Sequence, residues 1–190
     1  RRELLRLKSE LGLTILFVTH DLREAHLLAD RIAVFDGGRI LQLAPRDEVF
    51  RRPASRRVAE LTGVANIWPA TVTGVAGDQV TIDCAGLTLT ALCAPGHGFR
   101  AGQQVHAAVR AERVNLRRRD PVDPEPNLLD ATVVEEFAYG SSHVLHLRPS
   151  GKGPMVEVEL AARPYEVLDV ANRRSWTIEV PPADLHLVPD

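Results

Sequence analysis

The sequence predicts an α/β segment followed by a duplicated all-β half. Residues 14–18 are a continuous β-branched and apolar run, which is typical of a strand buried on both faces of a parallel sheet. Beyond Gly63 the chain changes to short segments rich in Val, Thr and Ile, separated by Gly, Asp and Pro. This texture predicts strands joined by turns. Within it, the segment at 66–72 returns at 127–133, which indicates two copies of one unit.

The first elements alternate between helix and strand. The leucines of residues 4–11 follow helical spacing, and Gly12 stands where a left-handed residue would end that helix. The buried strand at 14–18 comes next, and a polar loop follows it. Asp21 is well placed to accept hydrogen bonds from the first turn of another helix.

The remainder of the first 62 residues predicts a hairpin and two short helices. Residues 31–35 read as another buried strand, and residues 39–43 return from it after a tight turn at 36–38 that contains two glycines. Pro45 fits the first turn of a helix through Phe50, and Ser55 caps another through Leu61. We place the domain boundary between residues 62 and 63.

The second domain, 63–190, divides into two repeats. Repeat 1 covers about 66–116 and repeat 2 about 127–190, and the polar linker 117–126 carries three prolines that favour an extended chain. A unit of roughly 50–60 residues is small for a core of its own. The two β-barrel units are therefore expected to interlock and bury their apolar faces together.

Composition excludes several classes of protein. The net charge is -2 and aromatic residues make up 5% of the chain, so neither a basic nucleic-acid surface nor a basic membrane surface is expected. No apolar run approaches the roughly 20 residues that span a bilayer. The two cysteines are too few for a disulfide framework and favour a reduced, cytosolic setting.

No metal site is expected. His143 and His146 are interpreted as sharing one face of a strand, but no third ligand lies in register with them. The cysteines lack the spacing of a zinc site.

Residues 17–25, together with 29–40, resemble the switch-histidine end of ABC ATPase domains. The resemblance implies that His20 is a catalytic and nucleotide-binding residue that contacts the γ-phosphate of ATP. The chemistry is reasonable, because ligands bind at the carboxyl ends of parallel strands and an imidazole can hydrogen-bond a phosphate oxygen.

The chain lacks the other parts of such an ATPase. No Gly-rich loop ends in Gly-Lys-Ser or Gly-Lys-Thr, and Lys8 and Lys152 are the only lysines. The family's general base and its magnesium ligand lie upstream of the switch strand. We therefore expect ATP and Mg²⁺ to be cofactors of a full-length subunit, with neither bound firmly to this chain and no hydrolysis by the chain alone.

The second half resembles the duplicated OB-like (TOBE/MOP-type) regulatory domain that follows the ATPase core in importers of oxyanions, metals, polyamines and sugars. Residues 109–116 and 137–142 carry this resemblance. It implies an α/β remnant of a P-loop ATPase domain followed by an all-β regulatory domain. The function implied is that of the C-terminal, regulatory part of a bacterial ABC importer's ATP-binding subunit. Residues 156–160 and 165–168 look closest to the molybdate and tungstate branch, which favours an oxyanion such as molybdate, tungstate or sulfate as cargo.

A regulatory anion site is predicted at Asn66, Ser141 and Ser142, since turns that converge N–H groups bind anions. The alternative is an ordinary polar turn. Two other functions compete with the importer hypothesis. A stand-alone oxyanion sensor would not need residues 1–62, and a nucleic-acid-binding OB module needs a basic, aromatic groove that this composition disfavours.

The expected partners are a second copy of the chain, the membrane-spanning permease subunits of the importer and a small oxyanion, with no nucleic acid. Trp68, Phe137 and Tyr139 are candidate apolar anchors for the homodimer. The expected location is cytoplasmic, on the inner face of the cell membrane through the permease.

Overall fold

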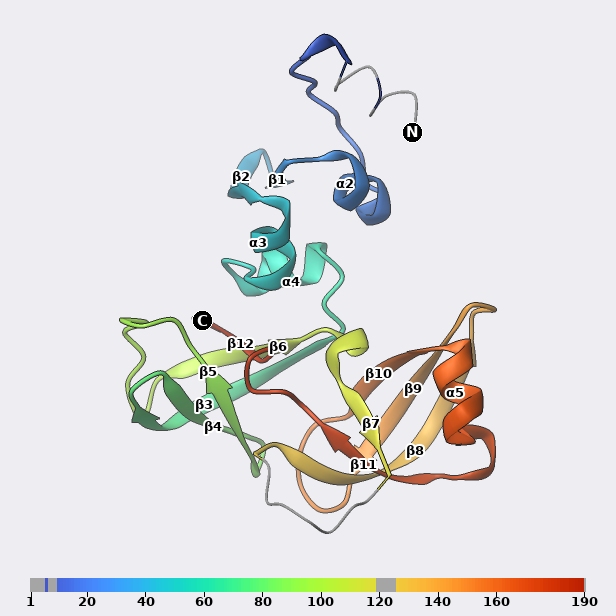
Figure 1. Ribbon diagram of the computed structural model, residues 1–190. Helices are drawn as coiled ribbons and strands as arrows, with labels where there is room; N and C mark the ends of the chain where they lie inside the picture. Colours follow the sequence, from blue (N-terminus) through green and yellow to red (C-terminus); the bar gives the residue numbers. More distant parts are fainter. Residues whose placement is uncertain (1–5, 7–9, 119–125, 190) are drawn as a thin grey trace.

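The computed structural model describes residues 6, 10–118 and 126–189, and it divides them into an N-terminal part and a β half (Figure 1). The N-terminal part, residues 10–62, holds short helices and one hairpin. The β half, from residue 63 onward, holds two five-stranded antiparallel sheets. Most of the helix predicted at 4–11 and of the linker predicted at 117–126 lies outside the described residues.

The short helices predicted for the N-terminal part are present, and side-chain caps begin two of them. Helix α2 (Leu22–Leu28) begins at Asp21, whose carboxylate accepts hydrogen bonds from the next turn. Helix α3 (Arg46–Arg51) has no side-chain cap, and Pro45 precedes it instead of lying in its first turn. Helix α4 (Arg56–Leu61) begins where the Ser55 hydroxyl accepts the N–H of Val58 at 3.2 Å.

The hairpin predicted around residues 36–38 is confirmed. Strands β1 (Arg31–Asp36) and β2 (Arg39–Pro45) pair antiparallel, and Asp36 faces Arg39 across a two-residue turn. Gly37 and Gly38 both have positive φ, 54° and 78°, which a two-residue turn of this hand requires. The first strand is less buried than predicted, because only Val34 in it is buried.

The buried strand predicted at residues 14–18 is not formed. Residues 13–19 have no regular secondary structure, and the side chains of Leu16 and Val18 are 94% and 90% exposed. A strand forms only where a neighbour accepts its backbone hydrogen bonds. No other segment of the described chain pairs with these residues, so their apolar character alone does not produce a strand.

The β half is built from ten strands in the described residues, five in each sheet. From one edge to the other, the first sheet has the order β12-β6-β3-β4-β5 and the second has the order β7-β11-β8-β9-β10. Their bounds are β3 (Asn66–Ala76), β4 (Gln79–Cys84), β5 (Leu87–Leu92), β6 (Gln104–Val109), β7 (Asn115–Arg117), β8 (Leu128–Ala138), β9 (Ser142–Pro149), β10 (Val156–Ala161), β11 (Ser175–Glu179) and β12 (His186–Pro189). Helix α5 (Ala162–Leu168) and the 3₁₀ turns η1 (Ala111–Arg113) and η2 (Val170–Asn172) complete the half.

The two sheets are built alike and exchange their last strands. Strands β3 to β6 correspond in order to β8 to β11, and the register shifts after Val72 in β3 and after Val133 in β8. Strand β7 follows the first copy in sequence but pairs with β11, whereas β12 follows the second copy but pairs with β6. Each sheet is therefore completed by the other copy.

One hydrophobic core joins the two copies. It runs without interruption from Ile82 and Leu89 in the first sheet to Leu145 and Leu147 in the second. Trp68 belongs to this core, with 6% of its surface exposed and its indole N–H donated to the carbonyl of Met155 at 3.1 Å. The expectation that Trp68 anchors contact with a second copy is therefore wrong for this structure, because the other copy of the repeat already covers it.

Candidate functional site

His20 lies in an exposed loop whose two neighbours are held by hydrogen bonds. The hydroxyl of Thr19 accepts the N–H of Asp21 at 3.0 Å and donates to the Glu24 carboxylate at 3.0 Å. The Asp21 carboxylate accepts the N–H groups of Arg23 and Glu24 at 2.8 and 3.2 Å. These bonds fix the backbone on both sides of His20 while its imidazole stays exposed. Such an imidazole is accessible to a phosphate oxygen.

Helix α2, which starts directly after this loop, packs against α3. The rings of His26 and Phe50 meet edge to face, with their centroids 5.0 Å apart. A guanidinium nitrogen of Arg46 donates to the carbonyl of His26 at 2.9 Å. At the end of α4, Gly63 has a φ of +74°, and a Cβ there would lie 3.0 Å from Leu22 Cδ1. Helix α2 is therefore in contact with α3 and with the chain that leaves α4.

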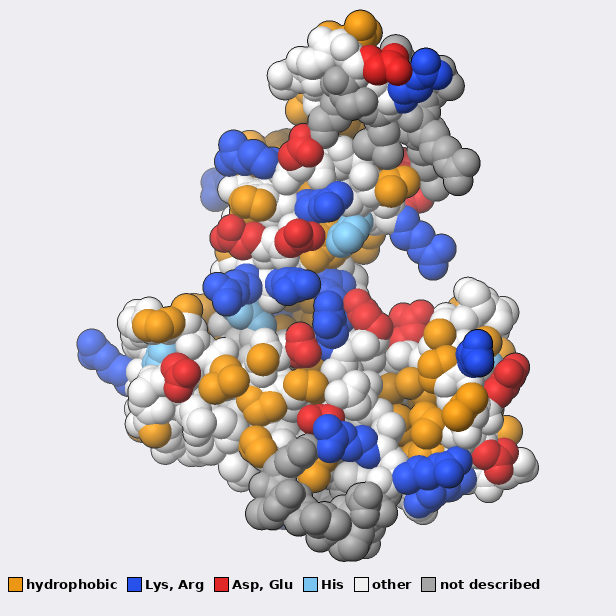
Figure 2. Space-filling view, viewed as in Figure 1, with side chains coloured by type: hydrophobic (Ala, Val, Ile, Leu, Met, Phe, Trp, Pro, Cys, Tyr) orange, Lys and Arg blue, Asp and Glu red, His pale blue; other side chains and the backbone are white. Residues whose placement is uncertain are grey.

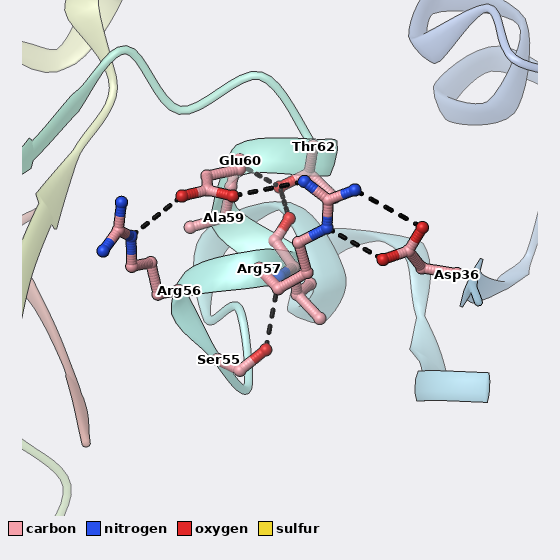
Figure 3. Close-up of polar contacts among 8 residues, drawn as sticks. Asp36, Ser55, Arg56, Arg57, Ala59, Glu60 and Thr62 are labelled. Carbon is pink, nitrogen blue, oxygen red and sulfur yellow. Dashed lines mark hydrogen bonds and ion pairs between the residues drawn. The ribbon is translucent and has the colours of Figure 1, made fainter. Parts of the chain in front are cut away.

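Helix α4 is tied to the hairpin by an exposed network of ions (Figure 3). The guanidinium of Arg57 donates to the Asp36 carboxylate at 2.8 and 3.4 Å and to Glu60 at 3.4 Å. Arg56 donates to Glu60 at 2.8 Å. The hydrogen bond from Arg57 is the main cause that lowers the pKa of Asp36. At the helix end, the Thr62 hydroxyl donates to the carbonyl of Val58 at 2.8 Å.

A cavity of about 920 Å³ is lined by residues of both the N-terminal part and the β half. Figure 2 shows Lys and Arg side chains gathered across this level of the molecule. The arginines that line the cavity are Arg23, Arg51, Arg52, Arg110 and Arg113, and its carboxylates are Asp47, Glu112, Glu159 and Asp184.

Arg110 and His186 cross the junction at the rim of this cavity. Arg110 donates from Nε to the carbonyl of Phe50 at 2.9 Å and from Nη1 to the carbonyl of Thr62 at 3.0 Å. His186 donates from Nε2 to the carbonyl of Pro53 at 3.0 Å. Neither contact is predictable from the sequence, because every residue has a backbone carbonyl and the sequence does not indicate which one will accept a hydrogen bond.

Asn66 has a structural position. Its amide nitrogen donates to the carbonyl of Glu157 at 2.8 Å, and its amide oxygen accepts the N–H of the same residue at 2.7 Å. The side chain is buried, with 2% of its surface exposed. Both ends of the amide are therefore engaged with β10, and the geometry gives Asn66 a role in holding that strand.

Ser141 and Ser142 lie near one end of the β9–β10 pair, away from the point on β10 that Asn66 contacts. Ser142 faces Ala161 across the β9–β10 pair, four residues beyond Glu157, which is roughly 13 Å along a strand. The backbone N–H of Ser141 donates to the carbonyl of Tyr139 at 2.9 Å within the turn. The structure therefore does not bring the three predicted anion-binding residues together, and an anion site remains a prediction for the serine turn alone.

The two histidines of β9 do not share a face, contrary to the prediction, since residues three apart in a strand point to opposite sides. His143 stacks on Tyr165 with ring centroids 3.6 Å apart. His146 places Nδ1 3.0 Å from Glu135 and Nε2 3.3 Å from Glu157. In the part of the chain that the structure describes, no group of three or more His, Cys, Asp or Glu residues is arranged to hold a metal ion.

Known proteins similar in sequence are importer subunits. Over 176 residues the chain is 38% identical to the spermidine/putrescine import ATP-binding protein PotA of Rubrobacter xylanophilus, and the match covers 89% of this chain and 45% of that protein. The PotA proteins of Roseobacter denitrificans and Marinobacter nauticus are 37% and 36% identical, over 77% and 76% of this chain and 40% and 38% of theirs. The chain thus spans less than half the length of these curated relatives.

The fold is similar to that of a solved oxyanion-binding protein. The structure of the cytoplasmic molybdate-binding protein ModG, with molybdate bound, superposes with a TM-score of 0.57 and 21% identity. The match covers 67% of this chain and 98% of that chain. No protein-family model matches the chain. No helix among the described residues is long and apolar enough to cross a membrane.

Two predictions from the sequence are confirmed by these comparisons. The relatives bear out the resemblance to ABC importer ATP-binding subunits, and ModG bears out the MOP-type, OB-like fold of the β half. The similarity in sequence runs through 89% of the chain, so it includes residues on both sides of Gly63.

Proposed function

We propose that this chain is the C-terminal part of the ATP-binding subunit of a bacterial ABC importer. Residues 1–62 form the end of its ATPase domain, and residues 63–190 form its duplicated regulatory domain. The observation that carries this proposal is the order of parts: a segment that resembles the end of an ABC ATPase domain is followed by a duplicated half whose fold is similar to that of ModG, and relatives named as import ATP-binding proteins match residues of both.

His20 acts as the switch histidine of this subunit. The loop geometry supports the role, because Thr19 and Asp21 hold the backbone and leave the imidazole exposed. In the complete subunit, His20 donates a hydrogen bond to the γ-phosphate of ATP, where negative charge must be stabilised during transfer. The residues that bind Mg²⁺ belong to the rest of the ATPase domain.

Polyamines are the cargo that the relatives favour. All three of the importer subunits described above are named for spermidine and putrescine. The oxyanion expected from the sequence has weaker support, because ModG is only 21% identical and that likeness concerns the fold. An oxyanion bound at the turn of Ser141 and Ser142 remains a second, regulatory hypothesis.

The partners follow from this function. Two copies of the subunit sandwich ATP, and permease subunits hold the pair at the inner face of the membrane. Phe137 and Tyr139 remain candidates for contact between β halves, since 44% and 66% of their surfaces are exposed.

A chimaera tests the proposal. The matched 176 residues of the Rubrobacter xylanophilus relative are replaced by this chain, and the hybrid is reconstituted in liposomes with that importer's permease. We expect ATP-driven uptake of spermidine. His20→Ala should lower ATP turnover by roughly 100-fold or more, the usual loss when a donor to transition-state charge is removed.

His146→Ala is the matched control, because His146 is a half-buried histidine of β9 and does not line the cavity beside the N-terminal part. This variant should leave turnover unchanged. Unchanged turnover in His20→Ala would refute the role of that residue. A correctly folded chimaera that hydrolyses no ATP would refute the importer assignment itself.

A further inference from the structure

The two parts of the molecule touch at few points. The cavity of about 920 Å³ lies between them. Beside it, an apolar group of Ala59, Val64, Ala108 and Val188 closes one side. Among the described residues, the side chains of Arg110 and His186 make polar contacts across the junction. Because packed atoms and hydrogen bonds transmit displacement through a protein, mechanical coupling between the parts depends on these contacts.

Arg110 makes the most extensive of these contacts. It leaves the β half just before η1 and reaches two carbonyls of the N-terminal part, that of Phe50 in α3 and that of Thr62 after α4. Its guanidinium also lies over the Phe50 ring, 5.2 Å from the centroid. A planar, multiply donating group can bond two separate carbonyls and stack at once, which an ammonium cannot.

The contact continues from Phe50 to the helix that follows His20. The imidazole of His26 also meets the Phe50 ring, with centroids 5.0 Å apart, and Nη1 of Arg46 in α3 donates to the carbonyl of His26 at 2.9 Å. His26 lies in α2, whose first turn is capped by Asp21. An unbroken series of contacts therefore joins Arg110, Phe50, His26 and the loop of His20.

The Arg110 contact is also able to open. Burial lowers the pKa of Arg110, but an arginine remains charged in proteins. Its Nη2 is buried and has no hydrogen-bond partner among the described residues. An unmet buried donor is unfavourable. A movement that admits water to the junction gives Nη2 a hydrogen bond, which partly offsets the breaking of the bonds to Phe50 and Thr62.

We propose that Arg110 is a positioning residue through which the β half sets the placement of α2 and of His20. The importance of that placement for ATP chemistry rests on the function proposed above, whereas the coupling itself is a property of this chain. When the β half binds a ligand or another subunit, a shift of Arg110 moves Phe50 and His26 with it.

Hydrogen exchange on the 190-residue chain tests the coupling. Arg110→Met keeps an unbranched apolar stem and removes the guanidinium. We expect amide exchange in α2 and α3 to become about tenfold faster or more, because the contacts of Arg110 are absent from the variant and local opening no longer has to break them. Exchange in β4 and β9, which lie inside the sheets, should not change. Arg113→Met is the matched control, since Arg113 is a nearby exposed arginine, whereas the carbonyls of Phe50 and Thr62 are bonded by Arg110. This variant should leave amide exchange in α2 unchanged.

Histidine NMR separates positioning from loss of stability. The Phe50 ring lies edge to face with the imidazole of His26, with centroids 5.0 Å apart, so we expect its ring current to shift the His26 resonances. Arg110→Met should therefore move the His26 signals under conditions where the chain remains folded. Arg110→Lys, which keeps the charge but bonds fewer carbonyls, should give an intermediate shift and intermediate exchange.

Unchanged exchange in α2 together with unmoved His26 signals in Arg110→Met would overturn the proposal. Equal effects of Arg110→Met and Arg113→Met would overturn it as well, because charge alone would then explain them. Neither measurement uses ATP. The coupling can thus fail while the importer function stands, and the importer function can fail while the coupling stands.

Discussion

Asn66 and Asn127 perform the same task from the first position of the two copies. Asn66 bonds both backbone groups of Glu157, and Asn127 bonds both backbone groups of Thr90 at 2.7 Å. Each asparagine thereby holds the edge strand of the other copy, β10 or β5. An amide side chain can do this because it presents a donor and an acceptor side by side, as a strand backbone does.

Replacing Asn66 with Leu leaves the N–H and carbonyl of Glu157 without their partner. We expect the free energy of unfolding to fall by about 1–3 kcal/mol, the cost of unsatisfied buried polar groups. Asn127→Leu should cost more, because Asn127 also donates to Val180 at 2.9 Å and has a φ of 63°, a conformation that leucine rarely adopts. Urea denaturation measures both variants. Asn115→Leu, at an exposed site, is the control, and a loss there as large as in Asn66→Leu would contradict the argument.

The sequence repeat points to these asparagines without revealing their role. The match of 66–72 with 127–133 places an Asn at the head of each copy, and the sequence-based interpretation of Asn66 is that of an anion ligand. The repeat alone cannot distinguish the two roles, since an amide that binds an anion and one that bonds a distant strand look alike in sequence.

At the scale of elements, features with local causes are predictable and features with distant causes are not. The cap at Asp21, the cap at Ser55 and the two-glycine turn form within a few residues, and all three are present. The strand predicted at 14–18 needs a pairing partner elsewhere and is absent. Arg110 bonds carbonyls 60 and 48 residues away, and no local pattern indicates such a contact.

The strand exchange is equally beyond sequence reasoning. The closing segments of the two copies carry matching apolar residues, including Leu116 in β7 and Leu187 in β12. Either segment has the pattern to complete either sheet. Pairing with the other copy is decided by how the chain reaches each free edge, which is a property of the assembled fold.

The exchange predicts crossed effects of mutation. Leu116 is buried in a strand that pairs with β11 of the second copy, so Leu116→Ala should accelerate amide exchange in β11. Leu187 pairs into the first copy beside β6, so Leu187→Ala should accelerate exchange in β6. Each change should cost about 2–5 kcal/mol, as for other buried leucines. If each variant loosened the sheet of its own copy instead, the exchanged topology would be wrong.

At the scale of the whole molecule, the junction between the N-terminal part and the β half contains His186, whose pKa is lowered. Burial is the main cause that lowers the pKa of His186 below its ordinary value of 6.5, and the nearby Arg52 acts in the same direction. The bond from Nε2 to the carbonyl of Pro53 opposes the shift. His186 is therefore neutral in the folded chain at neutral pH, and it holds Pro53 without carrying a charge.

The sign of the resulting pH dependence follows from this lowered pKa. As the pH falls through about 6.5, the histidine of the unfolded chain takes up a proton before His186 of the folded chain does, so acid favours unfolding. Asp36 and Glu60 also have lowered pKa values, but their contribution is lost only in more acidic solution, below the ordinary range of carboxylates near about pH 4. We therefore expect a lower melting temperature at about pH 5.5 than at about pH 7.5. His186→Gln keeps a donor for Pro53 but cannot titrate, so the difference should shrink in that variant. An undiminished difference in His186→Gln would show that other groups cause the pH dependence, and that His186 does not link the two parts in the manner described.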